Sequence, residues 1–362
     1  MVECRKENRY QGKKMVKKQG RVKKRQSKLE ERKDKLQELN RLIPWERFRP
    51  KLEVREPQQR KSPAGRKAID RLVLLKMLVL KYLYNLSNEE LEYQAHDRAS
   101  FRRFIGVGEE GEIPDATTVD NFEKKLQAKG LIEEVFQEFE EYLRESGYKA
   151  EGGQIIDATI VPVPIQRNSK EENEKIKKGE IPSEWQDKPH KLAQKDTEAR
   201  WTKKNKESHF GYKNHIDIDK KHGFIRRYSV TDASVHDSQQ LGAVLDPDNE
   251  GEEIWADSAY RSEKIEAGLE ALGHSSQIHE RAYRNRPLSE EQIANNREKS
   301  KTRAKVEHVF GAWVMSMGGK LMRGIGLQRV RAQIGLKNWV YNLQRYVFWQ
   351  KQKCCVVGGQ CV

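Results

Sequence analysis

Cysteine is scarce in this sequence and stands only near its two ends. The four cysteines among 362 residues are Cys4, Cys354, Cys355 and Cys361. None of them shows the Cys-x-x-Cys spacing of a zinc site, and no series of cysteines runs through the middle of the chain. We therefore predict neither a structural zinc site nor a disulfide framework.

Long apolar runs are absent as well. The mean hydropathy is −0.94, and the most apolar run, residues 72–86, is interrupted by Lys76 and Lys81. This run is too short to span a bilayer, and no segment in which apolar residues follow a charged start opens the chain. We therefore expect no polytopic membrane protein, no membrane partner and a cytoplasmic location.

Charge is abundant and unbalanced. Charged residues make up 35% of the chain, against about 25% in typical domains. Seventy lysines and arginines against 55 acids leave a net charge of +15, and twelve of these basic residues lie between Arg5 and Lys28. This balance suits a polyanionic partner such as nucleic acid, although a basic surface without such a partner is an open alternative.

The N-terminal part of the chain divides into an arm and a set of helices. Residues 1–67 form a basic arm and a proline-punctuated linker, with a short charged helix over 29–43. Residues 68–150 follow helical spacing, with Ser87 and either Asp115 or Thr117 as helix N-caps and Gly106 and Gly130 as breaks. The predicted helices are 68–85, one from Ser87, 100–105, one from Asp115, and 131–145. A helix-turn-helix that binds DNA and a plain helical bundle both explain this pattern.

From Gly152 the period changes to that of strands. Strands are predicted at 154–161, 210–219, 223–231, 252–257 and 275–279, and helices at 238–245, 263–272 and 297–317. Strands in hairpin order followed by alternating strands and helices predict an α/β domain with a mixed sheet. We assign residues 151–350 to this domain, with an insertion at about 166–206, and residues 351–362 to a tail.

Three carboxylates stand at positions that call for an explanation. Asp157 interrupts an apolar strand, Asp257 ends another strand, and Glu307 lies beside the apolar stripe of the last predicted helix. Brought together, they would offer the hard oxygen ligands that suit two Mg²⁺ ions, or Mn²⁺ in their place, and two such ions promote in-line displacement at phosphorus. Alternatively, all three acids are structural. Asp157 would then be a hydrogen-bonded strand residue, Asp257 a turn former and Glu307 an ion-pair partner of Arg303.

Six short segments then point to a family. In order along the chain they are IIDATIV (155–161), KDTEARWTKKN (195–205), FGYKNHIDID (210–219), VTDASVHDS (230–238), WADSAYRS (255–262) and TRAKVEHVFG (302–311). Their order and spacing resemble the DDE transposases of bacterial and archaeal insertion sequences, specifically the insertion-sequence-five group. The related insertion-sequence-four pattern has Tyr and Lys where this chain has Ser300 and Val314.

The resemblance implies a fold, a chemistry and a set of partners. The fold would be a ribonuclease-H-like α/β domain preceded by an all-helical DNA-binding domain, with Asp157, Asp257 and Glu307 as the catalytic and metal-binding triad. The activity would be Mg²⁺-dependent cleavage of double-stranded DNA at the terminal inverted repeats and strand transfer into target DNA, by a homodimer at the nucleoid. A non-catalytic, sequence-specific DNA-binding protein, derived from such an enzyme, is the alternative.

Further residues are predicted to contact DNA. Arg303 shares a helix face with Glu307 and could hold a phosphate or pair with that acid. Trp201 could grip DNA or be a packed loop side chain. The remaining predicted contacts are basic: Lys203, Lys204, Lys213 and Arg261.

Overall fold

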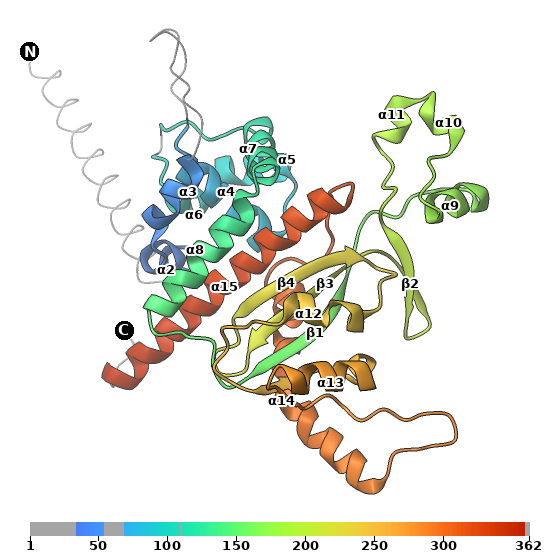
Figure 1. Cartoon of the computed structure of the whole chain (residues 1–362). Coiled ribbons are helices and arrows are strands. Elements are labelled where there is room, and N and C mark those ends of the chain that lie inside the picture. The colour runs from blue at the N-terminus through green and yellow to red at the C-terminus, as the bar shows by residue number, and fades with distance from the viewer. Residues whose placement is uncertain (1–33, 54–68, 109, 359–362) are drawn as a thin grey trace, which may run out of the picture.

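A six-stranded mixed sheet and one long helix organise the part of the chain that the computed structural model describes (Figure 1). That part comprises residues 34–53, 69–108 and 110–358, with side chains through residue 353. The predicted basic arm and the start of the predicted helix 29–43 lie outside the described residues, and the rest of that helix is α2 (Lys35–Leu42). None of the described helices combines the length and the apolar character that a membrane span requires.

The described chain is helical from Lys35 to Glu145. The helices are α2 (Lys35–Leu42), η1 (Trp45–Phe48), α3 (Arg49–Glu53), α4 (Arg71–Tyr84), α5 (Asn88–Asp97), α6 (Ala99–Ile105), α7 (Ala116–Ala128) and α8 (Leu131–Glu145). We call this set the helical region. The predicted caps are confirmed: Ser87 accepts a hydrogen bond from the amide of Glu90, Asp115 accepts one from Thr118, and Gly106 ends α6 in the left-handed conformation.

The prediction of a linker over residues 44–67 is wrong for its first ten residues. Pro44 is the N-cap of η1 and Pro50 lies in the first turn of α3, where a helix tolerates a residue without an amide hydrogen. Trp45, Phe48 and Leu52 are buried in the main core. The prolines therefore begin helices here and do not mark an extended connection.

The sheet is mixed, as predicted. Its strands are β1 (Gln154–Pro162), β2 (Arg200–Lys204), β3 (Glu207–Asp219), β4 (Ile225–Asp232), β5 (Glu253–Trp255) and β6 (Ser275–Ser276). β3 runs antiparallel to β1, β2 and β4, whereas β1, β5 and β6 run parallel. The amides of Gln277 and His279 donate to Ile254 and Ala256, so the pairing continues along the predicted strand 275–279.

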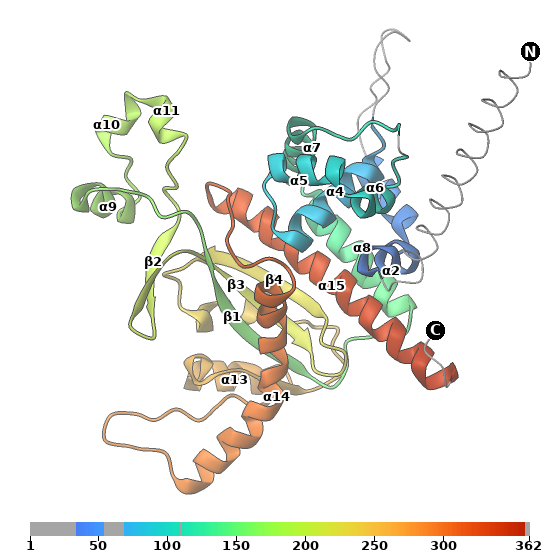
Figure 2. The same ribbon diagram turned by 180° about the vertical axis from the view of Figure 1, so that it is seen from behind.

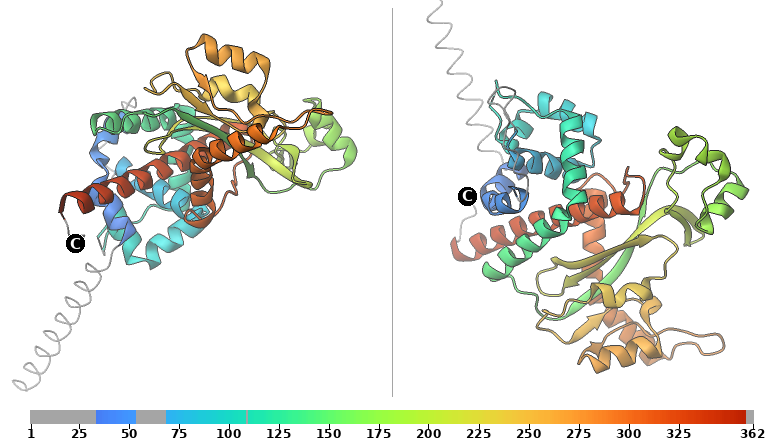
Figure 3. Two further views of the ribbon diagram at one scale, coloured as in Figure 1. Left: turned by 90° about the horizontal axis from the view of Figure 1, so that it is seen from below. Right: turned by 45° about the horizontal axis from the view of Figure 1, so that its top comes forward.

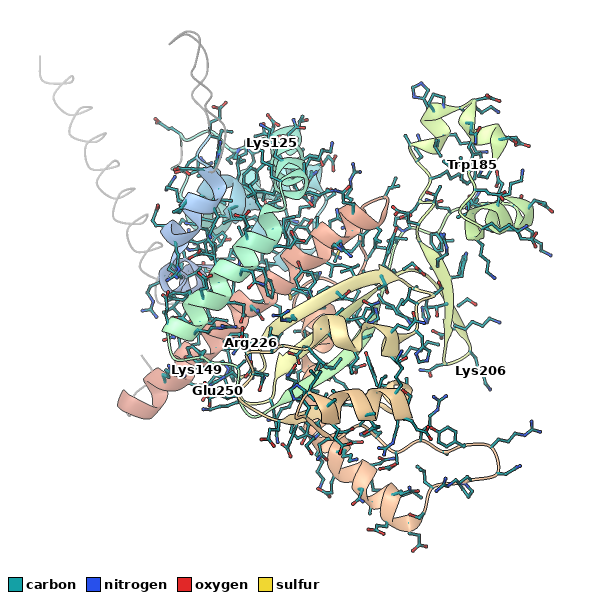
Figure 4. All side chains as sticks on the ribbon, viewed as in Figure 1. Lys125, Lys149, Trp185, Lys206, Arg226 and Glu250 are labelled. Atoms are coloured by element: carbon teal, nitrogen blue, oxygen red, sulfur yellow. The ribbon has the colours of Figure 1, made fainter. Side chains whose placement is uncertain are left out.

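The insertion is shorter than predicted and is folded. Its helices are α9 (Lys170–Lys177), α10 (Ser183–Gln186) and α11 (Pro189–Leu192), and they project from the sheet (Figure 3). Trp185, labelled in Figure 4, is fully buried among them and donates to Glu172. Residues 200–204, which we had included in the insertion, form β2 and pair with β3.

The remaining helices follow the strands. They are η2 (Asp237–Gln240), α12 (Leu241–Val244), η3 (Ser258–Tyr260), α13 (Glu263–Ala271), α14 (Glu290–Met315) and α15 (Leu327–Gly358). α14 begins seven residues before the predicted start because Ser289 and Gln292 form a capping box. The predicted tail boundary at 351 is wrong, since α15 continues to Gly358 without interruption.

α15 packs against the helical region on one side and against the sheet on the other (Figure 1). Toward the sheet, the buried amides of Asn338 and Asn214 exchange two hydrogen bonds. Asn342 accepts from the amide of Ile225 and donates to its carbonyl. Toward the helical region, Trp339 contacts the ring of Phe48 edge-on at 5.3 Å. The main apolar core consequently runs through both parts, and a smaller, separate core lies on the other face of the sheet under α12 and α13.

A buried arginine adds a polar connection between the same two parts. Arg226, on β4 (Figure 4), donates to Glu140 of α8, to Asp219 of β3 and to the carbonyl of Tyr148, each at 2.9 Å. Burial raises the pKa of Glu140 to about 7, although the Arg226 charge opposes this shift. Removing one partner of such a buried pair leaves the other charge uncompensated, so this contact specifies how α8 lies on the sheet.

Asp217 is a second buried charge, but without a partner. Both carboxylate oxygens lack a hydrogen bond among the described residues, and the side chain on β3 is inaccessible to solvent. Burial raises the pKa of Asp217 well above its ordinary value, and the negative charges of Asp246 and Asp219 raise it further. Since an isolated buried carboxylate is costly, the protonated form is the stable one in the folded protein.

This arrangement predicts how stability depends on pH. The pKa of Asp217 is higher in the folded protein than its value of about 4 in the unfolded chain. Asp217 therefore contributes its full stabilisation only below a pH of about 4, and this stabilisation is lost as the pH rises. Asparagine has no such titration. We therefore expect Asp217→Asn to gain stability relative to the wild type between pH 4 and 8, by up to about 1.4 kcal/mol per pH unit.

Urea unfolding of both proteins at several pH values measures this difference. Glu250→Gln, which changes an exposed carboxylate paired with Lys149, is the control and should show little dependence on pH. A difference between Asp217→Asn and wild type that stays constant across the range would contradict the prediction.

Candidate active site

Asp157 lies on β1 with its side chain mostly covered. Residues of β1 alternate between two cores: Ile155 enters the main core, and Ile156 enters a smaller one under α12 and α13. Asp157 shares the face of Ile155, and α14 contacts this strand. Its Oδ1 accepts from the amide of Ala158 at 2.7 Å, which leaves Oδ2 directed to other partners.

The environment of Asp157 favours its protonated form. Burial raises the pKa of Asp157 to about 6, the nearby Arg303 guanidinium opposes the shift, and the negative charge of Asp257 adds to it. The carboxylates of Asp157 and Asp257 therefore interact electrostatically. A carboxyl with a raised pKa beside a second carboxylate is a frequent feature of functional sites.

Asp257 follows β5, which pairs in parallel with β1. Its Oδ1 accepts from the amide of Ala259 at 2.8 Å and caps η3, so the predicted role as a turn former is also observed. The parallel pairing brings the end of β5 toward the middle of β1. Two strands of one sheet thus carry the two aspartates.

Glu307 reaches the same place from α14, which lies across β1 (Figure 2). Arg303, one turn earlier on α14, places Nη2 at 3.4 Å from Oε1 of Glu307 and at 3.7 Å from Oδ2 of Asp157. Because both contacts end on one nitrogen, these two carboxylate oxygens lie no farther apart than the two distances together, about 7 Å. Asp157 and Glu307 therefore lie near each other and share Arg303 as a partner, and the joint role of the three acids stays a prediction.

Carboxylate oxygens of this kind suit a hard divalent cation such as Mg²⁺ or Mn²⁺. Among the described residues, however, no three acidic, histidine or cysteine side chains are close enough together to hold a metal ion as they stand. The Arg303 guanidinium supplies positive charge between Asp157 and Glu307. In donor type and proximity, Asp157 and Glu307 fit a divalent cation. Arg303 would compete with such a cation for their carboxylate oxygens.

The predicted contacts on β2 are exposed, and one of them, Lys204, interacts with Asp157. The indole of Trp201 is 46% exposed and lies 5.2 Å from the ring of Phe210. Lys203 and Lys204 are exposed, and the positive charge of Lys204 is one of the groups that lower the pKa of Asp157. The hairpin formed by β2 and β3 carries Lys206 at its tip (Figure 4).

Two other predicted contacts are already paired. The Lys213 ammonium lies 2.8 Å from Oδ1 of Asp237 and donates to the carbonyl of Val235. Arg261 pairs with Glu280 and donates to the carbonyl of Ile278. The structure does not bring either cation into contact with the three acids, and a role of these residues in DNA contact stays a prediction.

Three residues near the acids were missed in the sequence. The buried hydroxyl of Tyr260 has no hydrogen-bond partner among the described residues, and burial, together with Asp157, Asp237 and Asp257, raises its pKa. Burial and the Arg303 charge lower the pKa of His279. Tyr260 belongs to the segment 255–262 and could have been found there, whereas His279 carries no such signal.

Lys320 is the third. It follows two glycines in the connection between α14 and α15, and its ammonium donates to the hydroxyl of Thr159 on β1 at 2.7 Å. Nothing in a lysine after Gly318 and Gly319 indicates this contact, because 161 positions separate the two partners.

Two family models match this chain, and it is similar to a solved structure. A family model described as "Transposase DDE domain" matches residues 148–343, a range that contains all three acids. A second, described as "Transposase domain (DUF772)", matches residues 24–125. Among solved structures, a piggyBac transposase synaptic complex with hairpin DNA is 11% identical, with 89% of this chain and 76% of that chain covered and a TM-score of 0.46. The mixed sheet flanked by helices, together with the first match, fits a ribonuclease-H-like fold.

The position of Arg303 predicts a competition with divalent cations. Removing its guanidinium in Arg303→Gln frees oxygens of Asp157 and Glu307 and removes a like charge that repels the metal. An ion pair of this exposure is worth up to about 1 kcal/mol, so we expect Mn²⁺ to bind up to about fivefold more tightly in the variant.

Calorimetric titration of the full chain with Mn²⁺ measures this change. Arg261→Gln, which removes a comparably exposed arginine paired with Glu280, is the matched control and should bind as the wild type does. Weaker binding in Arg303→Gln would show that the guanidinium supports the site and does not compete for it.

Proposed function

Because the chain belongs to the DDE transposases, it is a DNA transposase, and we propose that Asp157, Asp257 and Glu307 are its catalytic triad. Membership of this family also implies dependence on a divalent metal. The observation that carries the proposal is the position of Arg303 Nη2, within 3.7 Å of Asp157 and 3.4 Å of Glu307, while Asp257 interacts electrostatically with Asp157. Motif order favours the insertion-sequence-five group, since Ser300 and Val314 depart from the related pattern.

Each part of the fold has a task in holding these groups. β1 and β5 fix the two aspartates through backbone pairing, and α14 brings Glu307 and Arg303 across them. Two Mg²⁺ ions, for which Mn²⁺ could substitute, would supply Lewis-acid stabilisation of the reacting phosphate when bound by the three carboxylates. Asp157 must lose its proton to bind a cation, which its pKa of about 6 permits at neutral pH.

The reaction we propose has two in-line displacements at phosphorus. In the first, a water oxygen forms a bond to the phosphorus at the element end, and the 3′-oxygen leaves as a hydroxyl. In the second, this 3′-hydroxyl attacks a phosphorus of the target strand, whose own 3′-oxygen leaves. In this proposal Trp201, Lys203 and Lys204, which are exposed on the hairpin, grip the strand, and Arg303 contacts its phosphates.

We assign binding of the terminal inverted repeats to the helical region, as a DNA-binding domain. α7 presents an exposed stripe of hydrogen-bonding and basic side chains, namely Thr117, Asn121, Lys124 and Lys125 (Figure 4). The exposed face of α8 is acidic by contrast, with Glu133, Glu134, Glu141 and Glu145. This contrast favours α7 as the helix that enters the major groove, in a helix-turn-helix arrangement with α5 and α6.

The remaining proposals concern assembly and location. Joining two element ends in one reaction requires two active sites, so we infer a homodimer on DNA. The net charge of +15 favours association with DNA at the nucleoid.

Substitution of the triad tests the proposed site. We expect Asp157→Asn, Asp257→Asn and Glu307→Gln each to lower cleavage of DNA that carries the element's ends by about a hundredfold or more in Mg²⁺, because a metal ligand is lost. Binding of the same DNA, measured by electrophoretic mobility shift, should stay within a few-fold of wild type. Asp248→Asn, an exposed acid paired with Arg144, is the control.

The outcomes separate the hypotheses. A triad variant with wild-type cleavage would remove that residue from the site. Specific binding by a wild-type protein that shows no cleavage in Mg²⁺ or Mn²⁺ would favour the non-catalytic DNA-binding alternative.

Substitutions on α7 test the DNA-binding assignment. Asn121→Ala should lower the preference for end DNA over unrelated DNA by about 1–3 kcal/mol, if its amide reads a base edge. Lys125→Ala should weaken binding of end DNA and of unrelated DNA equally. It should also lower the slope of log affinity against log salt concentration by about the amount expected for one lost phosphate contact. Glu134→Ala, on the acidic face of α8, should not weaken binding, and equal losses in all three variants would contradict the assignment.

A further inference from the structure

Lys320 lies on the same face of β1 as the triad. Its ammonium donates to Thr159 Oγ1 at 2.7 Å, and Thr159 is two residues from Asp157, so both side chains project from one face of the strand. The ammonium also lies 5.3 Å from the ring centre of Phe310, which is three residues after Glu307 on α14. A cation from the connection after α14 thus contacts a side chain of β1 and one of α14.

The connection that carries Lys320 is held in place from several sides. Gly318 has φ +70°, and a Cβ there would lie 2.5 Å from the carbonyl oxygen of Tyr84 at the end of α4. Asn85 donates to the carbonyl of Gly318 at 3.1 Å. The fully buried Lys337 of α15 donates to the carbonyls of Met317 and Gly319 at 2.9 and 2.7 Å.

On its other side the connection is pinned to the sheet. The amide of Met322 donates to the carbonyl of Pro162 at the end of β1, at 3.0 Å. Lys320 therefore stands between two fixed points, and its ammonium is positioned before any ligand arrives. Such preorganisation lowers the entropy lost when a ligand is bound.

The charge of Lys320 is not neutralised by a carboxylate contact in the described part of the chain. Its ammonium donates a hydrogen bond to the neutral hydroxyl of Thr159, which engages one of three donor hydrogens. Burial and the charge of Lys204 lower the pKa of Lys320, while Asp157 raises it, so all three interact electrostatically. Lys213 differs, since Asp237 pairs with it directly.

Lys337 shows what a structural lysine looks like in this protein. It is inaccessible to solvent and its two carbonyl partners belong to the turn that it holds. Lys320 is only half-buried, has a neutral partner, and lies beside acids that are proposed to act on a phosphodiester. Its free donors and its charge suit a phosphate oxygen.

We propose that Lys320 binds a non-bridging oxygen of a DNA phosphate beside the cleaved bond and thereby aligns the strand against Asp157. The inference rests on the proposed triad and adds a substrate-contacting residue that lies outside the six sequence segments on which the resemblance was based. Lys320, Lys204 and Arg303 then approach the strand from three different elements. Because the contact is made to the reacting strand, it acts mainly on cleavage of bound DNA and little on affinity.

The test uses the full chain, pre-bound to DNA with the element's ends, under single-turnover conditions in Mg²⁺. We expect Lys320→Gln and Lys320→Met to slow cleavage by about a hundredfold while the dissociation constant changes less than threefold. Lys320→Arg, which keeps the charge, should recover most of the rate. Lys305→Gln, a change on the exposed face of α14, is the matched control and should cleave as the wild type does.

A neutral phosphate supplies the readout that a structural role would not change. Single methylphosphonates are placed in turn at the phosphates within two nucleotides of the cleaved bond. At one position the substitution should slow the wild type and the Lys305→Gln control but leave Lys320→Met unaffected, because the contact is already lost. Thermal unfolding of each variant checks folding, and Lys320→Met keeps the aliphatic packing on Phe310.

Two results would overturn the inference. One is a cleavage rate in Lys320→Met equal to that of the wild type. The other is a slow variant that remains sensitive to every methylphosphonate, which would make Lys320 a structural residue. Failure of the wild type itself to cleave would instead count against the proposed function, so the two failures are distinguishable.

Discussion

The polar contacts of α15 with the sheet are the constraint on which the rest of the structure depends. Asn338 pairs with Asn214 and Asn342 with the backbone of Ile225, all of them buried. Apolar contacts alone would allow a long helix to slide or rotate on a sheet, whereas buried amides must keep their partners or lose hydrogen bonds. These contacts set the register of α15. Through its other face they set the position of the helical region, and through Lys337 that of the turn before Lys320.

At the active site the governing problem is to hold negative charges close together. Asp157 shows this most clearly. Burial raises the pKa of Asp157 to about 6, and repulsion from the Asp257 carboxylate adds to the shift. Arg303 offsets this repulsion in the metal-free protein by contacting Asp157 and Glu307 with one nitrogen. Lys204 and Lys320 add positive charge from two further elements. The same cations that stabilise the acids in the free protein are then available to the phosphates of a bound strand.

Local signals in the sequence predicted most of the elements, because their causes are local. Ser87 and Asp115 cap helices in the structure as their spacing indicated, and Gly106 ends α6. Residues 44–53 were misjudged because a proline at the start of a helix and a proline in a linker look alike without knowledge of what the neighbouring side chains contact. α15 was not predicted, because it is buried on two sides and its buried positions include the polar Lys337, Asn338 and Asn342, so it lacks a clear amphipathic period.

By itself the sequence determined which side chains could do chemistry: three acids at strand and helix positions where a charge needs a reason, within segments that resemble one family. It also determined the strands that carry two of them, because alternation and turn residues are read over a few positions. Only the tertiary structure decided that Arg303 stands between Asp157 and Glu307, that Lys213 is paired with Asp237, and that Lys320 reaches Thr159. Arg303 and Glu307 are one turn apart on α14, but the contacts of Arg303 with Asp157 and of Lys320 with Thr159 join residues far apart in the chain. Their geometry follows from packing α14 and the connection after it on the sheet, which no local pattern encodes.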